Sequence, residues 1–371
     1  MRRTSRTALF AALLGLPAGP GRAELADLRR ALEQVPAAVL LKPDAVQAAY
    51  TDFADLRALP STETSGPHRF RPRFSPSLQS DTLQALDMGD GATWEEKTGL
   101  PMAELSSFLV FDTPDGSVTI WRFHEAGRMR SFLAGLERRG FAKDRDGSLT
   151  NGELGSLNLE RADPANPFGG IGGQSSMLAE AGGGVAQSYD AKPIAALRSP
   201  TGPGFGMLPQ VAAALDGLAK VAGTARLPQA MVLGVGAWAA DPFQGPASGP
   251  PVQPPRPPEG GPPPALAAIV ADIEDADRRG AILSIGYPDC GTAAKAGATF
   301  AEIWRTAPDL SKETPLQQTG AEPVTSEVSG SGGCAAVISL TTRPTGSDGN
   351  PVYAYLAKAV LQRDLKALSG R

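Results

Sequence analysis

The residues FAKDRDGSLTNGE, at positions 141–153, contain the spacing of oxygen ligands that a calcium loop requires. Asp144, Asp146 and Glu153 fall at ligand positions, with a glycine where such a loop turns sharply. Ala142 occupies the first ligand position, where a calcium loop needs an aspartate. A D-G turn between two strands explains the same residues, because D-G is a strong hairpin signal. We therefore expect a turn, and keep the three acidic residues only as weak metal candidates.

His124 is the candidate for acid–base catalysis, because an imidazole titrates near neutral pH. It lies beside Glu125 at the start of a predicted helix, where a surface or packing role explains it more simply. A hydrolase would need a serine and a carboxylate brought to His124 from distant parts of the chain. The G-x-S-x-G motif of a nucleophile elbow is absent. We assign no catalytic residue, and a hydrolase around His124 is the alternative function.

Cys290 and Cys334 are the only two cysteines of the chain. In an oxidising compartment such a pair forms a disulfide, which restricts the unfolded chain by about 4 kcal/mol. Structural zinc takes four ligands, and the two histidines, His68 and His124, are far apart in the sequence. The sequence therefore predicts one disulfide and no cofactor.

The first 23 residues have the organisation of a secretory signal peptide. Three arginines precede an apolar stretch from Ala8 to Leu16, and Gly21 and Ala23 have the small-residue spacing of a cleavage site before Glu24. The apolar stretch is shorter than the roughly 20 residues that cross a bilayer. Removal of residues 1–23 would leave 31 basic and 39 acidic side chains, a formal charge of −8. We expect a periplasmic or secreted protein without a membrane span, and its acidity argues against nucleic-acid binding.

Helical periodicity and a turn-rich connection predict a helical N-terminal segment over residues 24–76, with helix extending to Leu59. A first α+β unit is expected over 77–224. Its clearest part is SSFLVFDTPDGSVTIWRF, from residue 106, where two apolar runs flank a T-P-D-G turn. A helix follows, and then two strands near 147–150 and 154–160. The glycine-rich passage after them lacks the G-x-G-x-x-G pattern of a phosphate cradle, so we expect a loop.

A second α+β unit is expected over 225–371, from apolar runs separated by turns and two helices. It contains the segment 242–264, in which 11 of 23 residues are proline. Proline has no backbone donor, so this segment cannot join a sheet and is expected to form an extended, disordered loop. A Pro-rich segment of this kind is also a ligand type for aromatic grooves, so a protein partner is expected here.

The fold class that follows is α+β, with two units of mainly antiparallel sheet and helices packed on one face. The repeated hairpin–helix order suggests a tandem, ferredoxin-like arrangement, although no sequence repeat supports it. Because no catalytic constellation is evident, we expect a non-enzymatic binding or protein–protein interaction module.

Overall fold

A computed structural model describes most of the chain. The described residues are 20–41, 46–59, 81–88, 91–170, 172–238, 261–306, 322–330, 332–344, 349–361 and 364–369. Most of the predicted signal peptide, His68 and residues 242–260 of the Pro-rich segment lie outside them. The predicted cleavage point before Glu24 falls within a helix, α1 (Pro20–Glu33).

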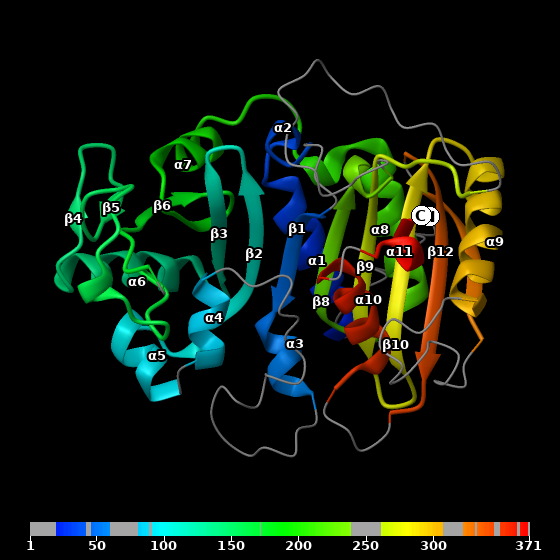
Figure 1. Ribbon diagram of the computed structural model, residues 1–371, viewed down its shortest axis with the longest axis horizontal. Coiled ribbons are helices and arrows are strands. Elements are labelled where there is room, and N and C mark those ends of the chain that lie inside the picture. Colours follow the sequence, from blue (N-terminus) through cyan, green and yellow to red (C-terminus); the bar gives the residue numbers. More distant parts are fainter. Residues whose placement is uncertain are drawn as a thin grey trace, which may run out of the picture.

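All described strands belong to one antiparallel sheet, in the order β11-β12-β10-β9-β8-β1-β2-β3-β7-β6-β5-β4 (Figure 1). The strands are β1 (Val46–Asp52), β2 (Leu105–Thr113), β3 (Gly116–Phe123), β4 (Ala142–Lys143), β5 (Leu149–Thr150), β6 (Met177–Ala181), β7 (Gly184–Ser188), β8 (Arg226–Gly234), β9 (Ala267–Glu274), β10 (Arg279–Tyr287), β11 (Val324–Gly330) and β12 (Gly333–Thr342). The α+β class with a large antiparallel sheet is confirmed. Two separate units and a ferredoxin-like topology are not confirmed, because the sheet continues through the β1–β8 pair.

The strands follow the same succession on either side of the β1–β8 pair. Outward from the middle, one side reads β1-β2-β3-β7-β6 and the other β8-β9-β10-β12-β11. The predicted T-P-D-G hairpin is confirmed as β2 and β3, which pair from Leu105–Phe123 to Thr113–Gly116. In its turn the Thr113 hydroxyl donates to Gly116 O and accepts from Asp115 N.

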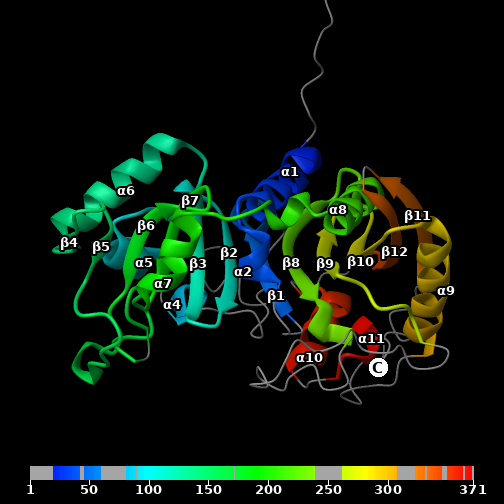
Figure 2. The same cartoon turned by 90° about the horizontal axis from the view of Figure 1, so that it is seen from above.

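Helices cover both faces of the sheet, so the prediction of helices on one face is wrong (Figure 2). The helices are α1, α2 (Ala37–Leu40), α3 (Phe53–Ala58), α4 (Asp81–Met88), α5 (Gly91–Thr98), α6 (Ala126–Arg138), α7 (Ala191–Arg198), α8 (Pro209–Ala222), α9 (Cys290–Thr306), α10 (Pro351–Leu361) and α11 (Lys366–Ser369). Helices α1, α7 and α8 share a core with one face, whereas α3 to α6 and α9 to α11 share a core with the other. Every residue of β9 is buried, as expected for a strand covered on both sides.

The largest local difference from the sequence-based expectation concerns residues 46–52. The alanine-rich pattern predicts helix, but this run forms β1, a central strand paired with β2 and β8. Successive side chains of β1 point to opposite faces of the sheet, so Ala49 packs in one core while Ala48 and Tyr50 pack in the other. Tertiary pairing on both edges therefore overrides the helical preference of alanine. Helix begins only at Phe53, where the Asp52 carboxylate accepts from Asp55 N as an N-cap.

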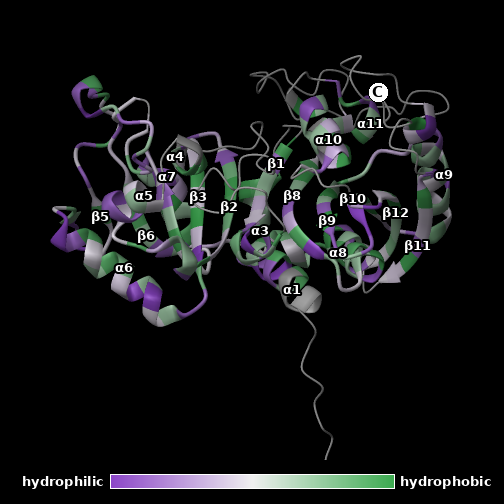
Figure 3. Cartoon of the chain, turned by 90° about the horizontal axis from the view of Figure 1, so that it is seen from below, coloured by the Kyte–Doolittle hydropathy of each residue, from purple (hydrophilic) through white to green (hydrophobic). Residues whose placement is uncertain are grey.

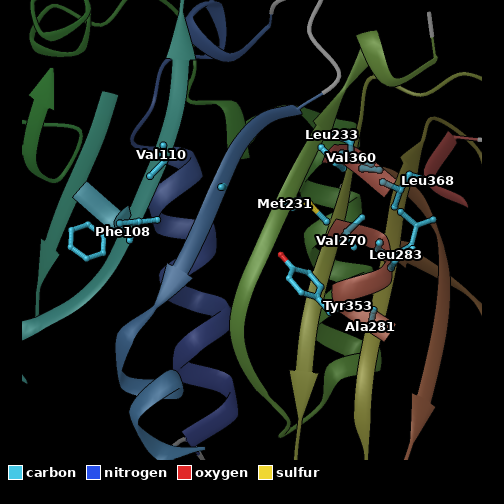
Figure 4. Close-up of a cluster of buried hydrophobic side chains, with 14 of the residues drawn as sticks. Phe108, Val110, Met231, Leu233, Val270, Ala281, Leu283, Tyr353, Val360 and Leu368 are labelled. Carbon is cyan, nitrogen blue, oxygen red and sulfur yellow. The ribbon is translucent and has the colours of Figure 1, made fainter. Parts of the chain in front are cut away.

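The two cores are continuous layers of apolar side chains. Figure 4 shows part of one core, in which residues of β8, β9 and β10 meet Tyr353 and Val360 of α10 and Leu368 of α11. Figure 3 shows the corresponding pattern, with mostly hydrophobic strands and a helix α6 that alternates hydrophobic and hydrophilic residues. Helix α8 approaches the sheet closely through Gly217, where a Cβ atom would lie 2.5 Å from the Ala335 side chain.

Candidate functional site

His124 lies at the end of β3, just before α6, and its side chain is exposed. An Arg57 guanidinium nitrogen is 3.4 Å from His124 Nε2, and the same guanidinium donates to Met102 O. Burial lowers the pKa of Arg57. Among the described contacts of the His124 ring there is neither a serine nor a carboxylate, so the geometry gives no support to a hydrolase triad.

The calcium-like residues form a tight turn between β4 and β5. Gly147 N donates to Asp144 O, and Gly147 has a φ of 83°. The Asp146 carboxylate is occupied by two partners, because it accepts from Ser148 N at 3.0 Å and from Arg198 at 2.6 Å. The strand predicted near 154–160 is absent from this fully described stretch, where turns and the 3-10 helix η4 (Leu159–Arg161) occur instead. Within the described ranges, no three or more His, Cys, Asp and Glu residues gather to hold a metal.

Cys290 and Cys334 form the expected disulfide. Cys290 is the exposed first residue of α9, whereas Cys334 is buried in β12. The Ser329 hydroxyl lies 3.6 Å from both sulfurs. The bond therefore ties the N-terminus of α9 to the strand beneath it.

The glycine-rich passage is the base of a projecting loop. Gly173 has a φ of 60°, and a Cβ atom on it would lie within 1.9 Å of Asn158 O, so a side chain cannot fit. The passage is a loop, as predicted, and its glycines allow close approach of the chain's own backbone. Asn151 braces the loop further, because its side chain accepts from Ser176 N at 2.7 Å and donates to Phe168 O at 3.2 Å.

Two leucines protrude from this braced loop. Leu157 is 68% exposed and Leu159 is 77% exposed, and we call them the leucine tip. The Asn158 side chain between them accepts from Glu160 N, and Arg161 donates to Asn151 O. In Figure 2 the loop projects away from the sheet at the lower left. The tip is therefore held out in solvent by specific contacts, and exposed apolar side chains on an ordered loop are typical of interaction sites.

A buried polar cluster, which the sequence analysis missed, lies beneath α1. Burial raises the pKa of Asp52 to about 7, against the opposing hydrogen bond from Asp55 N. Tyr50 OH donates to the second Asp52 oxygen at 3.0 Å, and burial also raises the pKa of Tyr50. Asp52 is 3% exposed and caps α3, so it titrates without access to a substrate. The only sequence signal was an aspartate before a helical run.

The polar cluster also connects the two sides of the sheet. Asp55 accepts from Leu227 N of β8 at 2.5 Å, across 172 residues of sequence. On the face that carries α1 and α8, Arg29 of α1 forms an ion pair with Asp216 of α8 at 2.5 Å. These contacts supplement the β1–β8 ladder at the middle of the molecule.

A second buried network lies on the opposite face, at the end of the β9–β10 hairpin. Arg279 donates to both carboxylate oxygens of Glu274, at 2.7 and 2.9 Å, and to Gly349 O. Asn350 donates to Asp272 at 2.6 Å and accepts from Tyr353 N at 3.2 Å, so it anchors the start of α10. Each of these polar groups is bonded to another part of the same half of the protein. The network therefore supports the fold and is not a candidate active site.

None of the helices in the described part combines the length and apolar composition needed to cross a membrane. No protein-family model and no curated protein matches the sequence. Two solved structures are similar, crystal forms III and I of TP0453, with TM-scores of 0.36 and 0.35 and sequence identities of 9% and 10%. They cover 88% and 89% of this chain and 98% of the TP0453 chain. At these TM-scores the similarity carries no argument about function.

Proposed function

We propose that this chain is an exported, non-enzymatic protein–protein interaction module built from two tandem α+β units. The observation that carries the proposed interaction is the leucine tip. Burial of a leucine side chain contributes about 1.5–3 kcal/mol, and here two leucines are kept in water by a loop that is braced on both sides. A partner with an apolar pocket would bury them without an ordering cost to the loop.

The tandem units are supported by the matching order of elements. In each half, a long helix precedes the first strand, α1 before β1 and α8 before β8, and both helices lie on the same face. After the third strand of each half comes another long helix, α6 or α9, and both pack on the opposite face. In the second half β11 and β12 then follow, and in the first half β6 and β7 take the matching positions, while the short strands β4 and β5 extend the sheet beyond them.

Export is supported by the N-terminal sequence and by the disulfide, because such bonds persist in oxidising compartments. The Pro-rich segment 242–264 remains a second proposed contact for a protein partner.

The test is affinity capture from envelope extract with the mature chain, beside a Leu157→Ser/Leu159→Ser variant and a chain lacking 242–264. We expect a partner that the first bait retains and the leucine variant loses, while circular dichroism shows both baits folded. Equal capture by the mature chain and the leucine variant would show that the leucine tip does not contact the partner. Loss of the partner only from the chain lacking 242–264 would assign the contact to the Pro-rich segment. Binding to none of the baits would contradict the proposed function.

A further inference from the structure

Strand β11, with seven residues, lies at one edge of the sheet and has no strand of the described chain on its far side. The opposite edge of the sheet, β4, has only two residues. Exposed edge strands present backbone donors and acceptors to other chains, and proteins commonly shorten them or interrupt them with charges and proline. β11 contains no proline, and Glu327 is its one charged residue. Its first residue, Val324, is 60% exposed.

The hydrogen-bond alternation identifies which β11 residues direct their backbone groups outward. Its phase is set at the β9–β10 turn, where Asp275 N donates to Arg278 O. Because bonded pairs alternate along antiparallel strands, even-numbered residues of β10 bond to β9 and odd-numbered residues bond to β12. The even-numbered residues of β12 are the ones opposite those odd-numbered residues of β10, so the odd-numbered residues of β12 bond to β11. Their partners are the even-numbered residues of β11. Thr325, Glu327 and Ser329 therefore direct N–H and C=O groups to the open side.

The side chains of β11 divide between two helices. Val328 packs in the core that includes α8, and a Cβ atom on Gly330 would lie 2.7 Å from the Asp216 carboxylate of that helix. Since side chains alternate along a strand, Val324 and Ser326 share the α8 face. Thr325 lies on the other face, 3.9 Å from the Cβ position of Gly297 in α9.

We propose that β11 pairs antiparallel with β11 of a second copy, around a two-fold axis at Ser326. This register places Thr325 opposite Glu327 of the second copy, which joins residues whose backbone groups point outward. It also places Val324 opposite Val328, so the exposed valine gains an apolar neighbour. The alternative axis at Glu327 would put the two glutamates directly opposite each other, and like charges in that position are destabilising. This inference goes beyond the proposed function and does not depend on the leucine tip.

The first test measures the sedimentation velocity of the mature chain over a wide concentration range. We expect a monomer–dimer equilibrium, and Glu327→Pro should raise its dissociation constant at least tenfold, because each copy loses an outward N–H donor. Proline is tolerated at an edge position whose N–H faces solvent, so the fold should survive. Glu327→Gln keeps the donor and should dimerise at least as well as the wild type. A wild type that stays monomeric, or a dimer unaffected by Glu327→Pro, would overturn the proposal.

The second test fixes the register by cross-linking. Opposite residues on the axis form a non-hydrogen-bonded pair with Cα atoms about 4.5 Å apart, within disulfide range. Ser326→Cys should therefore form a covalent dimer under mild oxidation, whereas Glu327→Cys and the remote control Arg130→Cys should form little. Peptide mapping must find a disulfide that joins position 326 of one copy to position 326 of the other, beside the native disulfide. Equal cross-linking by all three variants, or preferential cross-linking through position 327, would contradict the axis at Ser326.

Discussion

The two halves of the sheet share one strand succession, but different interactions stabilise their cores. In the first half Trp121 of β3 is the centre of an aromatic cluster, with ring centroids 5.2 Å from Phe108 and 5.3 Å from Phe132. Trp94 and Phe168 stack on the same indole at 5.4 and 5.7 Å. The second half also buries aromatic residues, among them Phe300 and Trp304, and adds the bidentate Glu274–Arg279 pair and a disulfide. One topology can thus be specified by quite different side chains.

The halves also differ at their outer ends. The first half ends in the two short strands β4 and β5 and carries the leucine tip. The second half ends in β11, which has no strand of the described chain on its far side. If both ends meet partners, they do so by different means, apolar side chains at one end and backbone groups at the other.

The largest expected effect is from Glu274→Ala in the second half. It leaves Arg279 buried without its carboxylate, and breaking a buried pair in this way costs about 3–5 kcal/mol. Urea unfolding should show this loss. The control is Glu302→Ala, which removes an exposed pair with Arg305 and should cost less than about 0.5 kcal/mol. If both variants lost equally little free energy of unfolding, the buried Glu274–Arg279 pair would not be a main source of stability in the second half.

Removal of the disulfide should have the next largest effect. Cys290→Ser/Cys334→Ser frees a loop with a sequence separation of 44 residues, and we expect the free energy of unfolding to fall by about 2–4 kcal/mol. Guanidinium unfolding of the variant and of the oxidised wild type measures the difference. A change below about 1 kcal/mol would show that the bond contributes little to the second half.

The junction between the halves should respond to pH through Asp52. Its folded pKa of about 7 lies above the ordinary value of 3.8, so the folded state binds the proton more tightly. The stabilisation is full below pH 4 and is lost as pH rises through 7, with a fall of about 2 kcal/mol between pH 5 and pH 7. Asp52→Asn keeps a capping side chain but does not titrate. Between pH 5 and pH 7, the unfolding free energy of the wild type should therefore fall by that amount relative to the variant. Parallel pH profiles of the two proteins would contradict the raised pKa of Asp52.

The smallest effect on stability is expected from Leu157→Ser/Leu159→Ser. Both side chains are mostly exposed, so the free energy of unfolding should change by less than about 0.5 kcal/mol. A thermal melt checks this together with the capture experiment. A marked loss of stability would show that the leucines support the loop rather than a partner contact.

Local signals in the sequence predicted the features that depend on few residues. The T-P-D-G hairpin, the D-G turn at Gly147 and the disulfide are all present. The helix predicted for β1 is wrong because its pairing partners, β2 and β8, lie far along the chain. The same distance hid Asp52, since burial under α1 and beside β2 raises its pKa, and no local pattern reports that burial.

The leucine tip was missed for a different reason. Alternating leucines near 154–160 resembled a strand, but Asn158 and Gly173 turn the chain into a loop. The glycines of the passage, first compared with a phosphate cradle, were the available signal, because they mark a close backbone approach.

The most direct test of two tandem units is native-state hydrogen exchange of Glu274→Ala, beside Trp121→Leu in the first half. If the halves are separate cooperative units, Glu274→Ala should speed exchange in β9, β10 and β12 while β2, β3 and β7 keep their protection, and Trp121→Leu should do the reverse. Uniformly faster exchange through the whole sheet in both variants would show a single cooperative body and contradict the two-unit account.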